Sequence, residues 1–150
     1  MHASVGKLIS SIYWHTQSYI EKKLDDYSIG IGEIPILMEL SRKGSINQKD
    51  LTKELYINKA TTSREIKKLI AKGYVKRRRD KKDKRNYIIS LTEKGKKVIP
   101  IIKKVLKEWR GKLLKGFSRD ERKFILNALE RVIENAILAK EELNGRNRRS

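Results

Sequence analysis

Apolar side chains recur at three- and four-residue intervals over most of this chain, and this spacing predicts amphipathic helices. We expect helices over residues 5–27, 33–41, 48–55, 59–72, 92–117 and 118–143. Pro100 lies inside the fifth of these segments and is expected to kink it. The repeat in the first segment consists of Val5, Leu8, Ile9, Ile12, Tyr13, Ile20 and Leu24.

Capping residues mark where several of these helices begin and end. Asn47 and Asn58 each precede a short helix, and an Asn side chain there accepts a hydrogen bond from an unpaired amide of the first turn. Ser118 and Glu121 have the spacing of a capping box. Gly73 supplies a stop after the second short helix. The two short helices therefore meet across a tight turn.

A β-hairpin is predicted after the second short helix. Residues 75–79 and 86–91 have strand character, and alternate apolar residues of the second strand fall on one face. In residues 76–85 eight of ten residues are basic, and Asp80 and Asp83 are the other two. Because apolar residues bracket this run on both sides, it lies on a hairpin rather than in a disordered tail.

The formal net charge of +19, from 37 Lys and Arg against 18 Asp and Glu, implies a polyanionic partner. Nucleic acid is the first candidate and an anionic membrane surface the second. No stretch approaches the roughly 18 consecutive apolar residues of a spanning helix, which argues against a membrane. The first 18 residues lack the apolar core of a secretory signal, and there is no Cys for disulfides. We therefore expect a cytoplasmic protein.

The helix predicted over residues 59–72 has two contrasting faces. At about 100° per residue, Thr62, Ile66 and Leu69 fall on one side. A cationic face that also carries small residues suits a recognition helix, which must enter a major groove about 12 Å wide. The alternative is an ordinary solvated basic face, which the tightly linked preceding helix disfavours. The outer face consists of Thr61, Arg64, Lys67, Lys68 and Ala71.

Asp80, Asp83 and Arg85 have the spacing D-x-x-D-x-R, and the sequence Leu91-Thr92-Glu93-Lys94-Gly95 follows the second strand. With the preceding elements, this order resembles the MarR family of regulators over nearly the whole chain. The chain departs from the family pattern at Tyr56, where Gly is common, and at Pro100. It also has no Cys for the peroxide-sensing mode of some members.

The resemblance implies a mainly α fold with a small β-hairpin wing. Residues 33–91 are expected to form a winged helix-turn-helix lobe, residues 1–28 and 92–143 a helical dimerisation region, and residues 144–150 a disordered basic tail. A homodimer would then bind double-stranded DNA at a pseudo-palindromic operator, as a transcriptional regulator and repressor. The residues expected to bind DNA are Asn58, Lys59, Thr61, Thr62, Arg64, Lys67, Lys68, Lys82, Asp83, Lys84 and Arg85. Within the wing, Asp83 is expected to pair with Arg85 and so order the loop.

Many MarR proteins release DNA when a small phenolic or aromatic carboxylate binds, so an aromatic pocket is of interest. Tyr13, Trp14, His15 and Tyr27 are the candidate ligand-binding residues, although aromatics at helical spacing also suit a dimer core. No catalytic residue, metal site or cofactor is expected, because there are two His and no phosphate-binding loop or paired-carboxylate motif. The alternatives are an effector-independent or architectural DNA-binding protein and a basic helical module for RNA or membrane.

Overall fold

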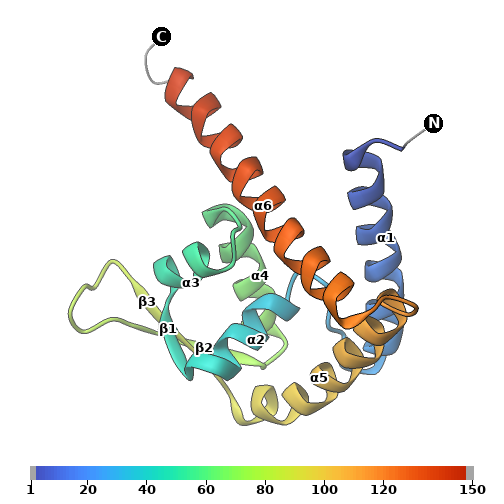
Figure 1. The fold of residues 1–150 in the computed structure, drawn as a ribbon. Helices are drawn as coiled ribbons and strands as arrows, with labels where there is room; N and C mark the ends of the chain where they lie inside the picture. Colours follow the sequence, from blue (N-terminus) through green and yellow to red (C-terminus); the bar gives the residue numbers. More distant parts are fainter. Residues whose placement is uncertain (1–2, 148–150) are drawn as a thin grey trace. The chain divides into compact units, whose positions relative to one another are not determined.

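The computed structural model describes residues 3–147, which are mainly helical and carry one small sheet (Figure 1). The chain forms two compact units, Met1–Arg110 and Gly111–Ser150. No helix of the described residues is long and apolar enough to cross a membrane. The elements in chain order are α1 (Val5–Lys23), the 3₁₀ turn η1 (Asp25–Tyr27), α2 (Ile34–Lys43), β1 (Ser45–Asn47), α3 (Gln48–Glu54), α4 (Lys59–Ala71), β2 (Val75–Arg79), β3 (Tyr87–Leu91), α5 (Glu93–Leu113) and α6 (Arg119–Asn147).

The core of the first unit lies between α2, α3, α4, the sheet and the first half of α5. Ile66 and Leu69 of α4 are fully buried, as the helical periodicity predicts. α1 adds Ile20 to this core and is otherwise largely exposed. The remaining fully buried apolar side chains are Leu24, Ile36, Leu37, Leu40, Leu51, Ile89 and Ile102.

The sheet is antiparallel, with the strand order β1-β3-β2. The hairpin of β2 and β3 is the predicted wing, and in its register Val75 faces Leu91 and Arg79 faces Tyr87. β1 is an addition to the predicted elements, and its Ile46 pairs with Ile89 of β3. Three residues are too few to display a two-residue period, so only the pairing with β3 defines this strand.

The predicted caps are present. The Oδ1 of Asn47 accepts from the amide of Lys49 at 2.8 Å, and Asn58 caps α4 in the same way. Ser118 and Glu121 form the reciprocal pair of a capping box, at 2.7 Å and 3.1 Å. These short-range bonds satisfy amides that the first turn of a helix leaves unpaired.

The predicted end of the last helix needs correction. α6 continues to Asn147, so residues 144–147 are helical and not disordered, while residues 148–150 of the predicted tail lie outside the described residues. Extending an existing helix costs little, and Arg146 in the last turn interacts favourably with the helix dipole. α5 includes Pro100 within one helix, Glu93–Leu113, and the kink expected there stays a prediction. Pro100 is exposed, so water can bond the carbonyl of Lys96 that lacks its helical donor.

Candidate nucleic-acid interface

α4 presents a basic outer face, as the sequence predicts. Lys59, Arg64, Lys67 and Lys68 are exposed, and Thr61 is half-buried beside them. The helix starts at a cap in which the Oδ1 of Asn58 accepts from the amide of Thr61 at 2.7 Å. A helix with one apolar side in the core and one cationic side in solvent is suited to a DNA groove.

Thr62 does not belong to this face, which corrects its assignment as a DNA-binding residue. It is fully buried, and its hydroxyl donates to the carbonyl of Asn58 at 3.0 Å. A Thr hydroxyl within a helix commonly bonds the backbone carbonyl one turn earlier, and this bond makes the Thr62 hydroxyl unavailable to a DNA base. The side chain of Asn58 is itself occupied as a cap on its oxygen, although the residue is exposed.

The cations of the outer face differ in how far they are neutralised. Lys68 forms an ion pair of 3.3 Å with the largely buried carboxylate of Glu65. Arg64 makes only a long contact of 3.5 Å to the hydroxyl of Thr61. Within residues 3–147 none of Lys59, Arg64 and Lys67 has a carboxylate at ion-pair distance, so these three are the free cations of the face.

The C-terminal end of α4 is held by contacts that sequence reasoning missed. The ammonium of Lys72 donates to Glu33 at 2.6 Å and to the carbonyl of Ser28 at 2.5 Å. Lys94 of α5 donates to the carbonyl of Lys72 at 2.7 Å. Because these partners come from the segment before α2 and from α5, they fix the orientation of α4 in its lobe.

The stem of the wing is stiffened by a cation–π stack. The guanidinium groups of Arg77 and Arg79 lie 4.5 Å and 5.3 Å from the ring centroid of Tyr87. Arg79 also donates to the carbonyl of Lys84 at 2.7 Å, across the base of the loop. This stack could have been predicted from the sequence. The two-residue alternation of paired strands places Arg77, Arg79 and Tyr87 on one face of the hairpin.

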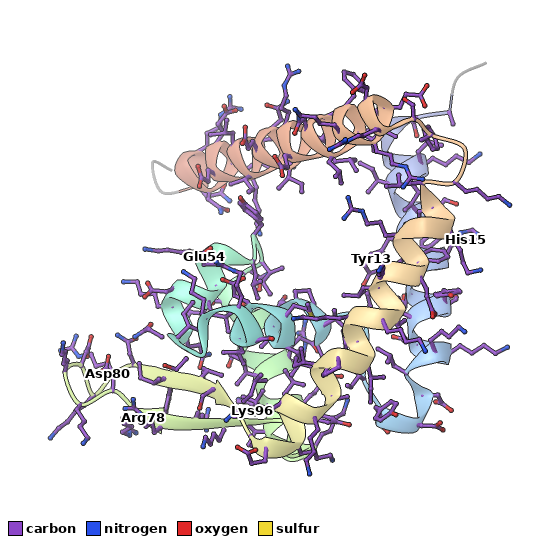
Figure 2. The ribbon with its side chains drawn as sticks, turned by 60° about the horizontal axis from the view of Figure 1, so that its bottom comes forward. Tyr13, His15, Glu54, Arg78, Asp80 and Lys96 are labelled. Atoms are coloured by element: carbon purple, nitrogen blue, oxygen red, sulfur yellow. The ribbon has the colours of Figure 1, made fainter. Side chains whose placement is uncertain are left out.

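Both aspartates of the wing hold its backbone (Figure 2 labels Asp80). Asp80 accepts from the amide of Lys82 at 2.9 Å. Asp83 accepts from the amide of Arg85 at 3.1 Å and from the side-chain amide of Asn86 at 2.9 Å. The two side chains therefore do not form the expected pair, and Asp83 contacts Arg85 through its backbone amide. The guanidinium of Arg85 has no carboxylate at ion-pair distance in residues 3–147, so it remains free for DNA.

A cavity of about 330 Å³ lies in the first unit, between η1, the start of β2 and the start of α5. The hydroxyl of Tyr74 donates to the carbonyl of Tyr27 at 2.6 Å, and the ammonium of Lys94 lies 4.5 Å from the ring centroid of Tyr74. Burial raises the pKa of Tyr74, and the Glu33 carboxylate adds to that rise. The lining residues are Tyr27, Tyr74, Lys94, Lys97, Val98 and Ile101.

Of the four predicted ligand-binding residues, only Tyr27 lines this cavity. Tyr13, Trp14 and His15 lie on α1 and are exposed (Figure 2 labels Tyr13 and His15). Tyr19 of α1 and Trp109 of α5 are partly buried against the core, and their ring centroids lie 4.5 Å apart in a stacked pair, which indicates a structural role. Sequence reasoning missed the two lysines of the cavity, Lys94 and Lys97, because no periodic pattern distinguishes them from the other residues that follow the hairpin.

The chain is similar to known regulators along most of its length. The MarR family profile matches residues 30–87. The HTH-type transcriptional regulator SarZ of Staphylococcus aureus strain MRSA252 is 33% identical over 122 residues, which cover 79% of this chain and 80% of the relative.

Solved structures show the same architecture. A MarR transcriptional regulator from Methanosarcina mazei Go1 is 47% identical, has a TM-score of 0.79, and is matched over 90% of this chain and 97% of its own. A MarR mutant from E. coli in complex with operator DNA shares the fold, with a TM-score of 0.76 at 22% identity, over 85% of this chain and 92% of that one. The basic α4, the ordered wing and these similarities lead to one conclusion: this chain belongs to the MarR family of winged helix-turn-helix, DNA-binding transcriptional regulators.

Proposed function

We propose that this protein is a dimeric repressor that binds a pseudo-palindromic operator and releases it when a small aromatic or phenolic anion binds. The observation that carries the DNA-binding part is the pairing of a free cationic face on α4 with a wing whose loop is already ordered. Preorganised cations lose little conformational freedom on binding a polyanion, so they favour tight association.

The two DNA-reading elements are proposed to act differently. Arg64, with Thr61 beside it, would reach base edges in the major groove, while Lys59 and Lys67 contact phosphates. Arg85 in the wing would enter or follow the minor groove, where a narrow groove attracts Arg. Lys82 and Lys84 would contact phosphates, and Asp83 would keep the loop in shape for all three.

The dimer is supported by apolar surface that the chain leaves exposed. α1 exposes Ile12 and Trp14, which is 65% exposed. No residue of α6 is buried. Its exposed apolar side chains are Phe124, Leu126, Leu129, Val132, Ile133, Leu138 and Leu143. Faces of this extent usually mark an interface, so we assign dimerisation to residues 1–28 and 92–143.

The effector is proposed to bind in the 330 Å³ cavity. Lys94 and Lys97 would hold a carboxylate, and Tyr74 and Ile101 would contact an aromatic ring. Lys94 already donates to the carbonyl of Lys72 at the end of α4. A bound anion competes for that ammonium, so it would loosen the recognition helix and favour a state that binds DNA less well.

The DNA-reading proposal is tested with an operator selected in vitro from random duplexes. Arg64→Ala should cost about 1–3 kcal/mol on that operator and much less on random DNA, because a base contact carries the specificity. Lys84→Ala is the matched wing variant and should weaken both DNAs alike. Equal losses on both DNAs for Arg64→Ala would contradict a base-reading role.

The effector proposal is tested by titrating small aromatic carboxylates into the operator complex. We expect one or more of them to lower operator affinity, and Lys97→Gln to blunt the effect without changing affinity in the absence of ligand. If no compound changes affinity and none binds the free protein, the architectural alternative is favoured. Binding without any loss of operator affinity would reject the release mechanism alone.

A further inference from the structure

The exposed side of α5 carries a row of lysines that neither the recognition helix nor the wing includes. These positions are separated by three, four or seven residues, and such spacings keep side chains on one broad helical face. All of them are exposed and lie in the first unit. We call them the lysine ridge: Lys96, Lys103, Lys104 and Lys107.

The ridge is not neutralised by its surroundings. Lys96 forms an exposed ion pair of 3.1 Å with Glu93 at the start of the helix. The other three ridge lysines have no carboxylate at ion-pair distance in residues 3–147. Lys103 and Lys104 each lie within about one helical turn of Lys107, and like charges at that spacing destabilise a helix, so the row carries a cost that a balanced face would avoid.

A comparison within the chain shows that α5 does not merely follow the basic composition of the protein. α6 has six basic and six acidic residues and is balanced. α5 has eight basic residues against two acidic ones, Glu93 and Glu108, which lie towards its two ends. A helix face that only had to be solvated would have balanced charges like α6. The excess of basic residues on α5 therefore points to an anionic partner.

The position of the ridge suits double-stranded DNA. α5 begins at Glu93, directly after β3, and its start is tied to β2 by the amide of Thr92, which donates to the carbonyl of Tyr74 at 3.0 Å. Figure 2 shows Lys96 at this start of α5, where the hairpin that carries Arg78 and Asp80 joins the helix. The ridge therefore continues the cationic surface from the base of the wing along α5.

We infer that the lysine ridge is a third phosphate-binding element, which holds duplex DNA beyond the groove contacts of α4 and the wing. At 1.5 Å per residue, its lysines extend over about 16 Å of helix axis. A duplex presents a phosphate charge every 1.7 Å or so of its own axis, which gives several phosphates within reach. The ridge adds affinity without sequence preference, and it acts independently of the proposed effector.

The test uses a triple variant, Lys103→Gln with Lys104→Gln and Lys107→Gln, which leaves the cavity lysines intact. The matched control replaces Lys22, Lys123 and Lys140 with Gln, because these exposed lysines lie outside α5 and give the same decrease in charge. DNA affinity is measured against salt concentration for both variants, on the selected operator and on a random duplex of equal length. Circular dichroism checks that both remain folded.

We expect the ridge variant to reduce the salt slope by about 0.9 for each phosphate that it no longer neutralises, up to about 2.7 for each bound chain, equally on both duplexes. The control variant should leave the slope near that of the unmodified protein. Replacing the three ridge lysines with Arg should retain the slope. The inference is overturned if the ridge and control variants behave alike, because net charge alone would then account for the change. A weakening confined to the operator would also overturn it.

Discussion

Asp83 brings a negative charge into the most cationic loop of the protein, and its hydrogen bonds explain why. It holds the amide of Arg85 and the side chain of Asn86. Asp83→Ala should therefore weaken operator binding although it removes a charge that repels phosphate. Asp26→Ala, which removes an exposed carboxylate outside the wing, is the control and should leave binding unchanged or slightly tighter. DNA affinity measured over a range of salt concentrations distinguishes the two variants. Tighter binding by Asp83→Ala at every salt concentration would show that Asp83 does not order the wing and that the loop is flexible.

The phenol of Tyr74 should make the free energy of unfolding decrease at alkaline pH. Burial, and then the Glu33 carboxylate, raise the pKa of its phenol in the folded protein. The unfolded chain therefore releases this proton at lower pH than the folded one. The stabilisation is complete below about pH 10 and is lost as the pH rises through the folded pKa. Urea unfolding between pH 8 and 11 should show this decline, and Tyr74→Phe should flatten it.

The matched control for Tyr74→Phe is Tyr56→Phe, because Tyr56 is 67% exposed. This variant should keep the alkaline decline of the unmodified protein. If Tyr74→Phe and the unmodified protein lose stability in parallel above pH 10, the decline belongs to other groups.

At the scale of elements, the start of α5 packs against β2 too closely for any side chain at Gly95. A Cβ there would lie 2.1 Å from the carbonyl oxygen of Tyr74. Gly95→Ala should therefore lower the free energy of unfolding by at least about 2 kcal/mol. Gly111→Ala in the same helix meets nothing within 4 Å and should stabilise by up to about 1 kcal/mol. Chemical denaturation of the two variants compares them directly; equal effects would show that α5 is not docked in this way.

At the scale of the whole molecule, the exposed apolar side chains of α1 and α6 predict that the protein assembles. Sedimentation at micromolar concentration should give twice the chain mass of 17.5 kDa. Ile133→Glu should lower this mass and weaken operator binding, because one reading head then binds alone. Asn127→Glu, an exposed polar position of the same helix, should do neither. A monomer for the unmodified protein would reject the dimer.

The sequence by itself determined the local structure of this protein. The helices and their caps at Asn47, Asn58 and Ser118 depend on residues within about four positions of one another along the chain. The hairpin pairs residues that are at most 16 positions apart, from Arg79 with Tyr87 to Val75 with Leu91. For the same reason both faces of α4 were predictable, since the helical period already placed Thr62 on the inner side with Ile66, where it is buried. Only the assignment of Thr62 as a DNA-binding residue was wrong.

Only the tertiary structure decided how these pieces are held together. β1 exists because β3 passes beside it. The end of α4 is fixed by Lys72 bonding Glu33, 39 residues away, and the cavity wall closes where Tyr74 bonds Tyr27, 47 residues away. Such distant partners are brought together by the path of the chain and the packing of its core. These contacts produce no periodic pattern in the sequence near either partner, so the sequence alone could not predict them.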